Sequence, residues 1–117
     1  NVRNTILTLF DFGVIPIINE NDTVSVKELR LGDNDTLGAQ ITNMIGADML
    51  IILTDVDGLY TSSPQDDPTA GPVYTVINID REVEKMAGHT GSILGTGGMQ
   101  SKIKAAKMVA ACGGSSF

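Results

Sequence analysis

Several features on which common classes of protein depend are scarce in this chain. Its 117 residues include a single cysteine, Cys112, and a single histidine, His89. One cysteine cannot form an internal disulfide, and one residue of each type leaves no Cys/His spacing that resembles a zinc site. The scarcity of cysteine fits a reducing, cytoplasmic setting best.

Basic residues are also few, with 8 Lys and Arg against 14 Asp and Glu, which gives a formal net charge of -6. This charge has the wrong sign for binding a phosphate backbone, and no run of Lys and Arg or ladder of aromatic residues compensates for it. We therefore expect no nucleic acid to bind through this segment.

Long hydrophobic runs are absent as well. The longest runs, such as MLIIL at residues 49–53, have the length of a strand and fall far short of the roughly 20 residues that a membrane helix needs. No signal peptide is visible. These absences predict a chain that has no membrane partner.

What the chain does contain is a hydrophobic content of 42%, enough for one domain with a core in a length too short for two. Its ends suggest a part of a longer domain. Asn1 is not an initiator methionine and is followed at once by a helical pattern, whereas GGSSF at 113–117 ends where an α/β chain would enter its next strand. We expect both ends to lack their neighbours.

The hydrophobic pattern predicts helices that alternate with strands. Apolar residues recur at helical spacing over 2–12, and Gly13 is a natural terminator. VIPIIN at 14–19 is typical of a buried strand, and partial alternation over 24–31 suggests a half-buried strand or hairpin arm.

The same pattern continues to the end of the chain. We expect a helix over 37–45 that ends at Gly46, a strand over 49–54 that is covered on both faces, and an exposed loop over 61–72. A strand over 73–79 and a helix capped by Asp80 follow. The last expected element is a helix from Met99 to Cys112, with an apolar stripe at Met99, Ile103, Ala106 and Ala110. Strand, helix and strand with short joins predict an α/β fold.

A glycine-rich segment at 88–98 leads into the last predicted helix and places Lys102 in its first turn. The positive end of the helix dipole disfavours a lysine there unless an anion is bound. A nucleotide phosphate, held by backbone N–H groups and the ammonium, would be such an anion. A glycine loop followed by a solvated lysine explains the segment equally well, and the P-loop pattern GxxxxGK[ST] is absent.

A second polar cluster, TDVDGLYT at 54–61, follows the most apolar strand. Ligands of open α/β sheets gather at the carboxyl ends of strands, so Thr54 and Asp55 are candidate site residues. A plain turn with Asp57 and Gly58 in turn positions is the simpler interpretation of the cluster. A calcium loop is excluded because the required set of ligands is incomplete.

Two further clusters crowd acids and amides together. INENDTV at 18–24 leaves a predicted strand and could bind an amino-acid substrate, although a polar turn explains it as well. In GDND at 32–35, Asp33 is a good N-cap, and an acid at Asp35 suits the helix dipole. For Asp35 alone, capping is the simpler role.

Taken in order, the segments PIINEND, GDND, LTDVDGLY and GTGGM-x-[ST]-K resemble the amino acid kinase family over essentially all 117 residues. Within that family, INEND and GTGGM resemble the members that phosphorylate L-glutamate. The resemblance implies an α/β fold in the form of a three-layer sandwich with a mainly parallel central sheet. Residues 1–117 would be a partial domain, holding the end of the substrate-binding part and the first portion of the nucleotide-binding part.

The activity that the resemblance implies is ATP-dependent phosphorylation of the 5-carboxylate of L-glutamate to L-glutamyl 5-phosphate, the first step of proline biosynthesis, with ATP and Mg²⁺ as cofactors. Asp22 and Asn34 would bind glutamate, and Thr54 and Asp55 would contact the nucleotide. The phosphate-binding segment would be Thr96, Gly97, Gly98, Met99, Gln100, Ser101 and Lys102, in which Lys102 also neutralises charge on the transferring phosphoryl group. The resemblance leaves the metal ligands unassigned.

Asp35 would organise the reacting groups. A carboxylate substrate is already ionised at neutral pH, so no general base is needed to create the nucleophile. In phosphoryl transfer the protein mostly positions the reactants and stabilises developing charge. We therefore expect Asp35 to hold catalytic lysines by ion pairing.

Alternatives within the family are acetylglutamate kinase, aspartokinase and uridylate kinase, which lack the pairing of INEND with GDND. A second class of alternative is a non-catalytic module that binds a nucleotide or an amino acid. A third is a flavodoxin-like domain, which would leave the lysine at the start of the last predicted helix, Lys102, unexplained. Departures from the family pattern are minor at Gln100, Ser101 and Gly38. The family's N-terminal glycine-rich strand and a further catalytic lysine are missing, so the isolated 117 residues are expected to be inactive or barely active, and the full-length protein to be a homo-oligomer.

Overall fold

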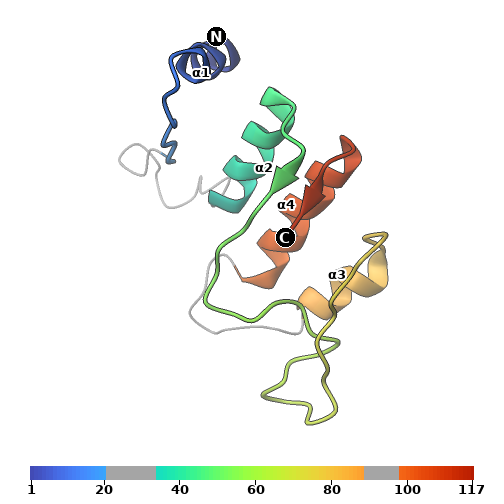
Figure 1. Cartoon of the computed structure of the whole chain (residues 1–117). Helices are drawn as coiled ribbons and strands as arrows, with labels where there is room; N and C mark the ends of the chain where they lie inside the picture. Colours follow the sequence, from blue (N-terminus) through green and yellow to red (C-terminus); the bar gives the residue numbers. More distant parts are fainter. Residues whose placement is uncertain (21–33, 89–97) are drawn as a thin grey trace, which may run out of the picture.

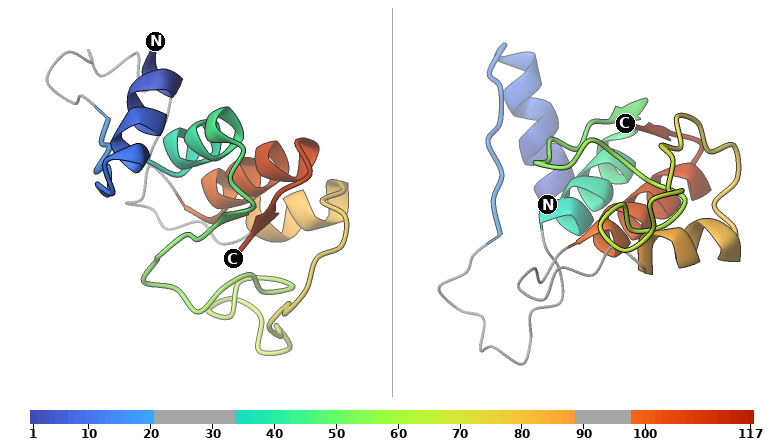
Figure 2. Two further views of the ribbon diagram at one scale, coloured as in Figure 1. Left: turned by 45° about the horizontal axis from the view of Figure 1, so that its top comes forward. Right: turned by 90° about the horizontal axis from the view of Figure 1, so that it is seen from below.

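The computed structural model describes residues 1–20, 34–88 and 98–117. The elements there are α1 (Val2–Asp11), α2 (Asn34–Ile45), β1 (Met49–Leu50), α3 (Arg81–Gly88), α4 (Met99–Ala111) and β2 (Ser115–Ser116). The helices lie in a row in the order α1, α2, α4, α3, and the two strands lie on one face of the α2–α4 pair (Figures 1 and 2). The predicted strand over 24–31 falls outside the described residues.

The two strands are parallel neighbours although they lie far apart in the sequence. Met49 aligns with Ser115 and Leu50 with Ser116. The ladder extends by two hydrogen bonds, one from the Phe117 N–H to the Leu50 carbonyl at 2.9 Å and one from the Ile52 N–H to the Phe117 carbonyl at 2.8 Å. Each strand follows the helix on which it packs, so the described residues confirm an α/β arrangement with parallel pairing.

Three predicted helix boundaries are confirmed. The chain reverses after α1 and α2 at glycines in the left-handed region, with φ +70 at Gly13 and φ +69 at Gly46. At the start of α3, the Asp80 carboxylate accepts a hydrogen bond from the Val83 N–H at 3.1 Å, which is the geometry of an N-cap. These signals are local, so they could be recognised without knowledge of the packing.

The predicted strands are largely wrong. Residues 14–19 and 74–79 have no regular structure, and Ile17 and Ile77 are 97% and 98% exposed. In the stretch 49–54 the strand ends at Leu50, and Leu53 is 91% exposed, so this stretch is not covered on both faces. A strand forms only where a neighbour accepts and donates its backbone hydrogen bonds. In the described parts of the chain, β1 and β2 supply a ladder to each other, and the predicted strand over 73–79 is joined to a neighbour at its first residue, by a hydrogen bond from the Val73 N–H to the Leu59 carbonyl at 2.8 Å.

The core lies on both sides of α4. On one side Ala39 of α2 packs against Ala105 and Val109 of α4, all fully buried. The small alanines let the two helices approach closely, and the Asn43 side-chain amide donates to the Met108 carbonyl at 3.0 Å across the same contact. On the other side, a second cluster is formed by Leu59, Val83 and Ala87 with Val73, Ile79, Met86, Met99 and Ile103.

Because α4 has a helix on each side, its buried positions differ from the single predicted stripe. Met99 and Ile103 do pack against the α3 side, but Ala110 is exposed and the most buried positions are Ala105 and Val109. Cys112, the last residue of the predicted helix, is exposed just after the end of α4, where Gly113 and Gly114 follow it.

Candidate active site

The candidate site is centred on two charged side chains, each in the first turn of a helix. Asp35 follows the first residue of α2, and Lys102 lies in the first turn of α4. The two helices run side by side with their N-terminal ends together (Figures 1 and 2). As a result the Lys102 Nζ donates to the Asp35 Oδ2 at 3.0 Å, although the residues are 67 positions apart.

The surroundings of this ion pair shield it from solvent. The side chain of Lys102 is 19% exposed and that of Asp35 is 17% exposed. Removing charges from water is costly unless further hydrogen bonds satisfy them. Ser101 supplies one of these, because its Oγ lies 2.8 Å from the same Asp35 Oδ2. One carboxylate oxygen therefore accepts from two consecutive residues of α4.

The electrostatics of the helix ends explain why this arrangement is favourable. The N-terminus of α2 carries a partial positive charge that stabilises Asp35, and the carboxylate offsets the unfavourable position of Lys102 at the N-terminus of α4. The anion that the sequence pattern requires near Lys102 is thus present as a protein carboxylate. A bound phosphate at Lys102 stays a prediction.

The two predicted glutamate-binding positions are only partly within reach of the structure. Asp22 lies outside the described residues, as does Asp33. The Asn34 Oδ1 accepts from the Glu20 N–H at 3.4 Å, so the end of segment 14–20 meets the start of α2. Glu20 of the INENDTV segment and Asn34 of the GDND segment therefore lie side by side, and Asn34 immediately precedes Asp35.

The predicted nucleotide contacts are more scattered. Thr54 and Asp55 are exposed, and no hydrogen bond or ion pair within the described residues joins them to Asp35 or Lys102. Gly98 is the N-cap of α4 and makes no side-chain cap. Gln100 approaches Gly88 at the end of α3. Thr96 and Gly97 fall outside the described residues, and Met99 packs against the α3 cluster.

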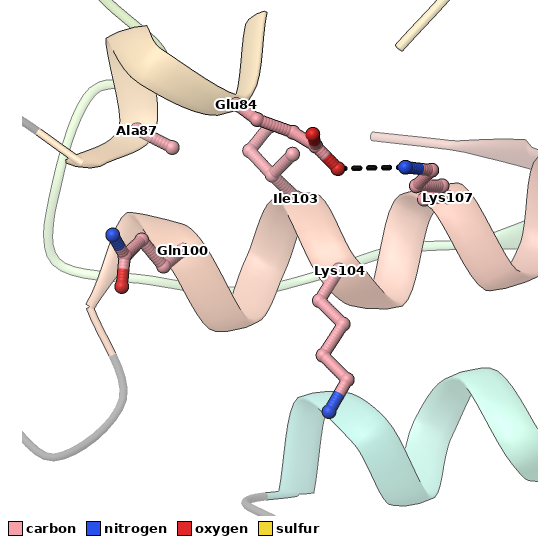
Figure 3. A pocket seen from close by; sticks show the side chains of 6 residues that line it. All are labelled: Glu84, Ala87, Gln100, Ile103, Lys104 and Lys107. Carbon is pink, nitrogen blue, oxygen red and sulfur yellow. Dashed lines mark hydrogen bonds and ion pairs between the residues drawn. The ribbon is translucent and has the colours of Figure 1, made fainter. Parts of the chain in front are cut away.

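A hollow that the sequence did not predict lies on the opposite side of α4. It has a volume of about 380 Å³ and is lined by Glu84, Ala87, Gln100, Ile103, Lys104 and Lys107 (Figure 3). Glu84 and Lys107 point toward each other across it at 2.7 Å, whereas Lys104 extends toward α2. The lining residues of α4 recur every three or four positions, which was the available signal.

The groove between α3 and α4 is not where the shielded charges are. The face of α4 that carries Ser101, Ala105 and Val109 packs on α2, and the groove lies on the face turned to α3. An open groove rimmed by solvated side chains shows a space but no chemistry. The closely packed side, with a shielded acid and a lysine, is therefore the better candidate for an active site.

Two absences apply to the part of the chain that the structure describes. In residues 1–20, 34–88 and 98–117, no three His, Cys, Asp or Glu side chains form a group that could hold a metal ion. None of the helices there has both the length and the apolar character to cross a membrane.

With this geometry in place, comparison with known proteins defines the class. Residues 1–116 match the Amino acid kinase family. The chain belongs to this family.

Several relatives of this chain carry the name of one enzyme. The chain is 63% identical to "Glutamate 5-kinase" of Desulfotalea psychrophila over 117 residues, which are 100% of this chain and 31% of the relative. It is 55% identical to "Glutamate 5-kinase 2" of Bacillus subtilis over 113 residues, 97% of this chain and 30% of the relative. For "Glutamate 5-kinase" of Laribacter hongkongensis the identity is 56% over the same number of residues, 113, with 30% of the relative covered. The chain thus spans somewhat less than a third of the length of these relatives.

Proposed function

We propose that this chain forms part of a glutamate 5-kinase, which uses ATP to phosphorylate the 5-carboxylate of L-glutamate and so begins proline biosynthesis. One observation carries the proposal. Lys102 and Asp35 form a shielded ion pair at 3.0 Å where α2 and α4 begin together. Membership of the amino acid kinase family supports the reaction class, and the names of the relatives support the substrate.

The chemistry asks little of the protein beyond positioning and charge. A glutamate side chain has a pKa near 4.3, so at neutral pH its carboxylate is already a nucleophile. Its oxygen attacks the γ-phosphorus of ATP, the bond from that phosphorus to the β–γ bridging oxygen breaks, and ADP leaves. Lys102 would stabilise the charge on the transferring phosphoryl group, and Asp35 would hold the Lys102 ammonium in place.

The remaining predicted residues fit around this pair. Asp22 and Asn34 would bind glutamate, since Asn34 begins the helix that carries Asp35. Thr54 and Asp55 would contact the nucleotide. The backbone from Thr96 to Lys102 would hold its phosphates, aided by the positive end of the α4 dipole.

Mg²⁺ is proposed as the metal that accompanies ATP. Magnesium commonly keeps several waters and is bound by one or two carboxylates together with substrate phosphates, so it needs no dedicated protein cage. Among the described residues, no three His, Cys, Asp or Glu side chains form such a cage. When bound, the ion would neutralise charge on the β- and γ-phosphates.

Two wider features also belong to the proposal. We infer a three-layer sandwich for the complete domain, because a further sheet and layer would cover apolar side chains that are exposed here, such as Ile17 and Leu53.

We also infer a cytoplasmic homo-oligomer. Size-exclusion chromatography with light scattering on the whole gene product that carries this sequence would measure its oligomeric state.

The function is tested by a kinase assay of the same whole gene product. L-Glutamate, N-acetyl-L-glutamate, L-aspartate and UMP are offered in parallel with ATP and Mg²⁺, and release of ADP is followed. Hydroxylamine traps an acyl phosphate as a hydroxamate, which identifies the product. We expect activity with L-glutamate at least about tenfold above the other acceptors. Preference for another acceptor would assign a different family member, and binding of ATP or glutamate without turnover would support a non-catalytic module.

A further inference from the structure

The hydroxyl of Ser101 has one proton, and two of the described residues place an acceptor within its reach. Its Oγ lies 2.8 Å from the Asp35 Oδ2 and 2.9 Å from the Gly98 carbonyl oxygen. A serine hydroxyl donates only one hydrogen bond, so the two acceptors compete for it. Serines in helices often donate to the carbonyl three or four residues earlier, which is the simpler interpretation of the Gly98 contact.

The other contacts of the two acceptors indicate which one receives the proton. The Gly98 carbonyl already accepts from the backbone N–H of Ser101 at 3.1 Å. Asp35 is a carboxylate, and hydrogen bonds to ionised acceptors are roughly twice as strong as those between neutral groups. The Asp35 Oδ2 is therefore the favoured acceptor, and it receives Ser101 and Lys102 together.

The Ser101 hydroxyl fixes the orientation of the Asp35 carboxylate, which Lys102 alone does not. The terminal torsion of an aspartate is broad, so its carboxylate rotates readily. Lys102 reaches it through a long, flexible side chain, whereas the Ser101 hydroxyl is one carbon from the backbone of α4. The short donor restricts the carboxylate rotation and keeps Oδ2 turned toward the Lys102 ammonium.

We propose that Ser101 is a positioning residue, whose hydroxyl orients Asp35 so that Asp35 can hold Lys102 for phosphoryl transfer. This inference rests on the proposed kinase function. It gives the Ser101 side chain a role that differs from the nucleotide contact expected from the sequence, since its hydroxyl faces a protein carboxylate.

The test compares two variants of nearly equal shape in the whole gene product. Ser101→Thr keeps the hydroxyl, and Ser101→Val replaces it with a methyl group. We expect Ser101→Val to lower kcat by about tenfold, the effect of losing one hydrogen bond to a charged group, while the KM for ATP changes by less than about twofold. Ser101→Thr should restore kcat to within about twofold of the unmodified protein. An unchanged kcat in Ser101→Val, or a loss expressed mainly in the KM for ATP, would overturn the inference.

A second measurement separates this inference from the proposed function. If the unmodified protein phosphorylates none of the four acceptors, the proposed function fails. The effect of Ser101 on the ion pair between Lys102 and Asp35 is then measured without turnover. Nitrogen-15 NMR of lysine ammonium groups detects those held in stable ion pairs, and the signal missing from Lys102→Met identifies Lys102. We expect this signal to be weakened in Ser101→Val and retained in Ser101→Thr. A signal that is the same in both variants would show that Ser101 does not position the pair.

Discussion

The two sides of α4 each hold a lysine–carboxylate pair, and the two pairs differ in how far their side chains are exposed to solvent. Lys107 and Glu84 are closer, at 2.7 Å, than Lys102 and Asp35, at 3.0 Å. However, the side chains of the first pair are 55% and 44% exposed. Exposed pairs contribute about 0–1 kcal/mol, whereas charges shielded from water interact through a lower effective dielectric constant.

The packing around the pairs differs in the same sense. Toward α2, α4 is sealed by Ala39, Ala105 and Val109, and the ion pair lies at the end of this closed contact. Toward α3, an open groove of about 380 Å³ lies beside the Lys107–Glu84 pair. Close packing and shielding from solvent therefore distinguish the candidate site from the groove.

The strongest test of this comparison removes the lysine on each side. Lys102→Met should lower kcat by about 10³-fold, because a charge that stabilises the transition state is lost. Lys107→Met, on the same helix, should change kcat by less than about twofold, since its pair is solvated. Both are measured by glutamate-dependent ADP release from the whole gene product.

Comparable losses in the two lysine variants would contradict the distinction between the sides of α4. Circular dichroism and thermal unfolding of both variants serve as the control for folding. We expect both variants to fold, because a methionine keeps most of the length of the lysine side chain.

The next largest effect is expected from the acids. Asp35→Asn keeps the shape of the side chain but removes the charge that holds Lys102, so kcat should fall by about 10²-fold. Its effect on ATP binding, measured by nucleotide titration, should be far smaller. Glu84→Gln is the matched change on the α3 side and should leave both quantities nearly unchanged. If Asp35→Asn weakened ATP binding as much as it lowered kcat, the organising role of Asp35 would be lost.

A smaller effect, on stability, compares two valines. Val109 is fully buried between α2 and α4, and Val83 packs in the more open α3 cluster. Val109→Ala should lower the free energy of unfolding by about 2 kcal/mol, because the closed contact cannot relax into the cavity, and Val83→Ala by about 1 kcal/mol. Urea unfolding of the two variants gives the values. A larger loss for Val83→Ala would mean that the α3 contact is the tighter one.

The smallest effect is expected in the loop outside both helix contacts. Hydrogen bonds from the Ser62 and Thr69 hydroxyls and from the Thr69 N–H lower the pKa of Asp67 from its ordinary value of 3.8. A lowered pKa in the folded state means stabilisation that is present above pH 3.8 and is lost as the pH falls through the folded value. Asp67→Asn should therefore be slightly less stable than the unmodified protein at pH 6, and the difference should be smaller at a pH below 3.8. Thermal unfolding at both pH values measures it, and a difference that grew on acidification would contradict the assignment.

The helices and their ends could be predicted from the sequence because their signals are local. The periodicity of α2, the glycines that end α1 and α2, and the Asp80 cap each depend on residues within a few positions. The strands could not be predicted in the same way. The apolar stretches at 14–19 and 73–79 have strand composition, but a strand also needs a neighbour, which among the described residues β1 finds in β2.

The candidate site follows the same division. Lys102 was notable from its place in a first helical turn, whereas Asp35 alone was better explained as part of a helix cap. Only the packing of Ala39 on Ala105 brings the two starts together, and no sequence period encodes that contact. The groove beside Lys107 was missed because polar residues on one helix face are usually solvated.

The sequence separation within the candidate site has a consequence for biosynthesis. Asp35 is followed by Lys102 only 67 residues later. At roughly 5–20 residues per second, a ribosome needs on the order of 3–13 seconds to add that stretch. During this interval α2 exists without α4 to cover its Ala39 face, and β1 has no β2 beside it. Until α4 and β2 are made, the Ala39 face of α2 and the edge of β1 therefore lack the neighbours that cover them in the folded chain.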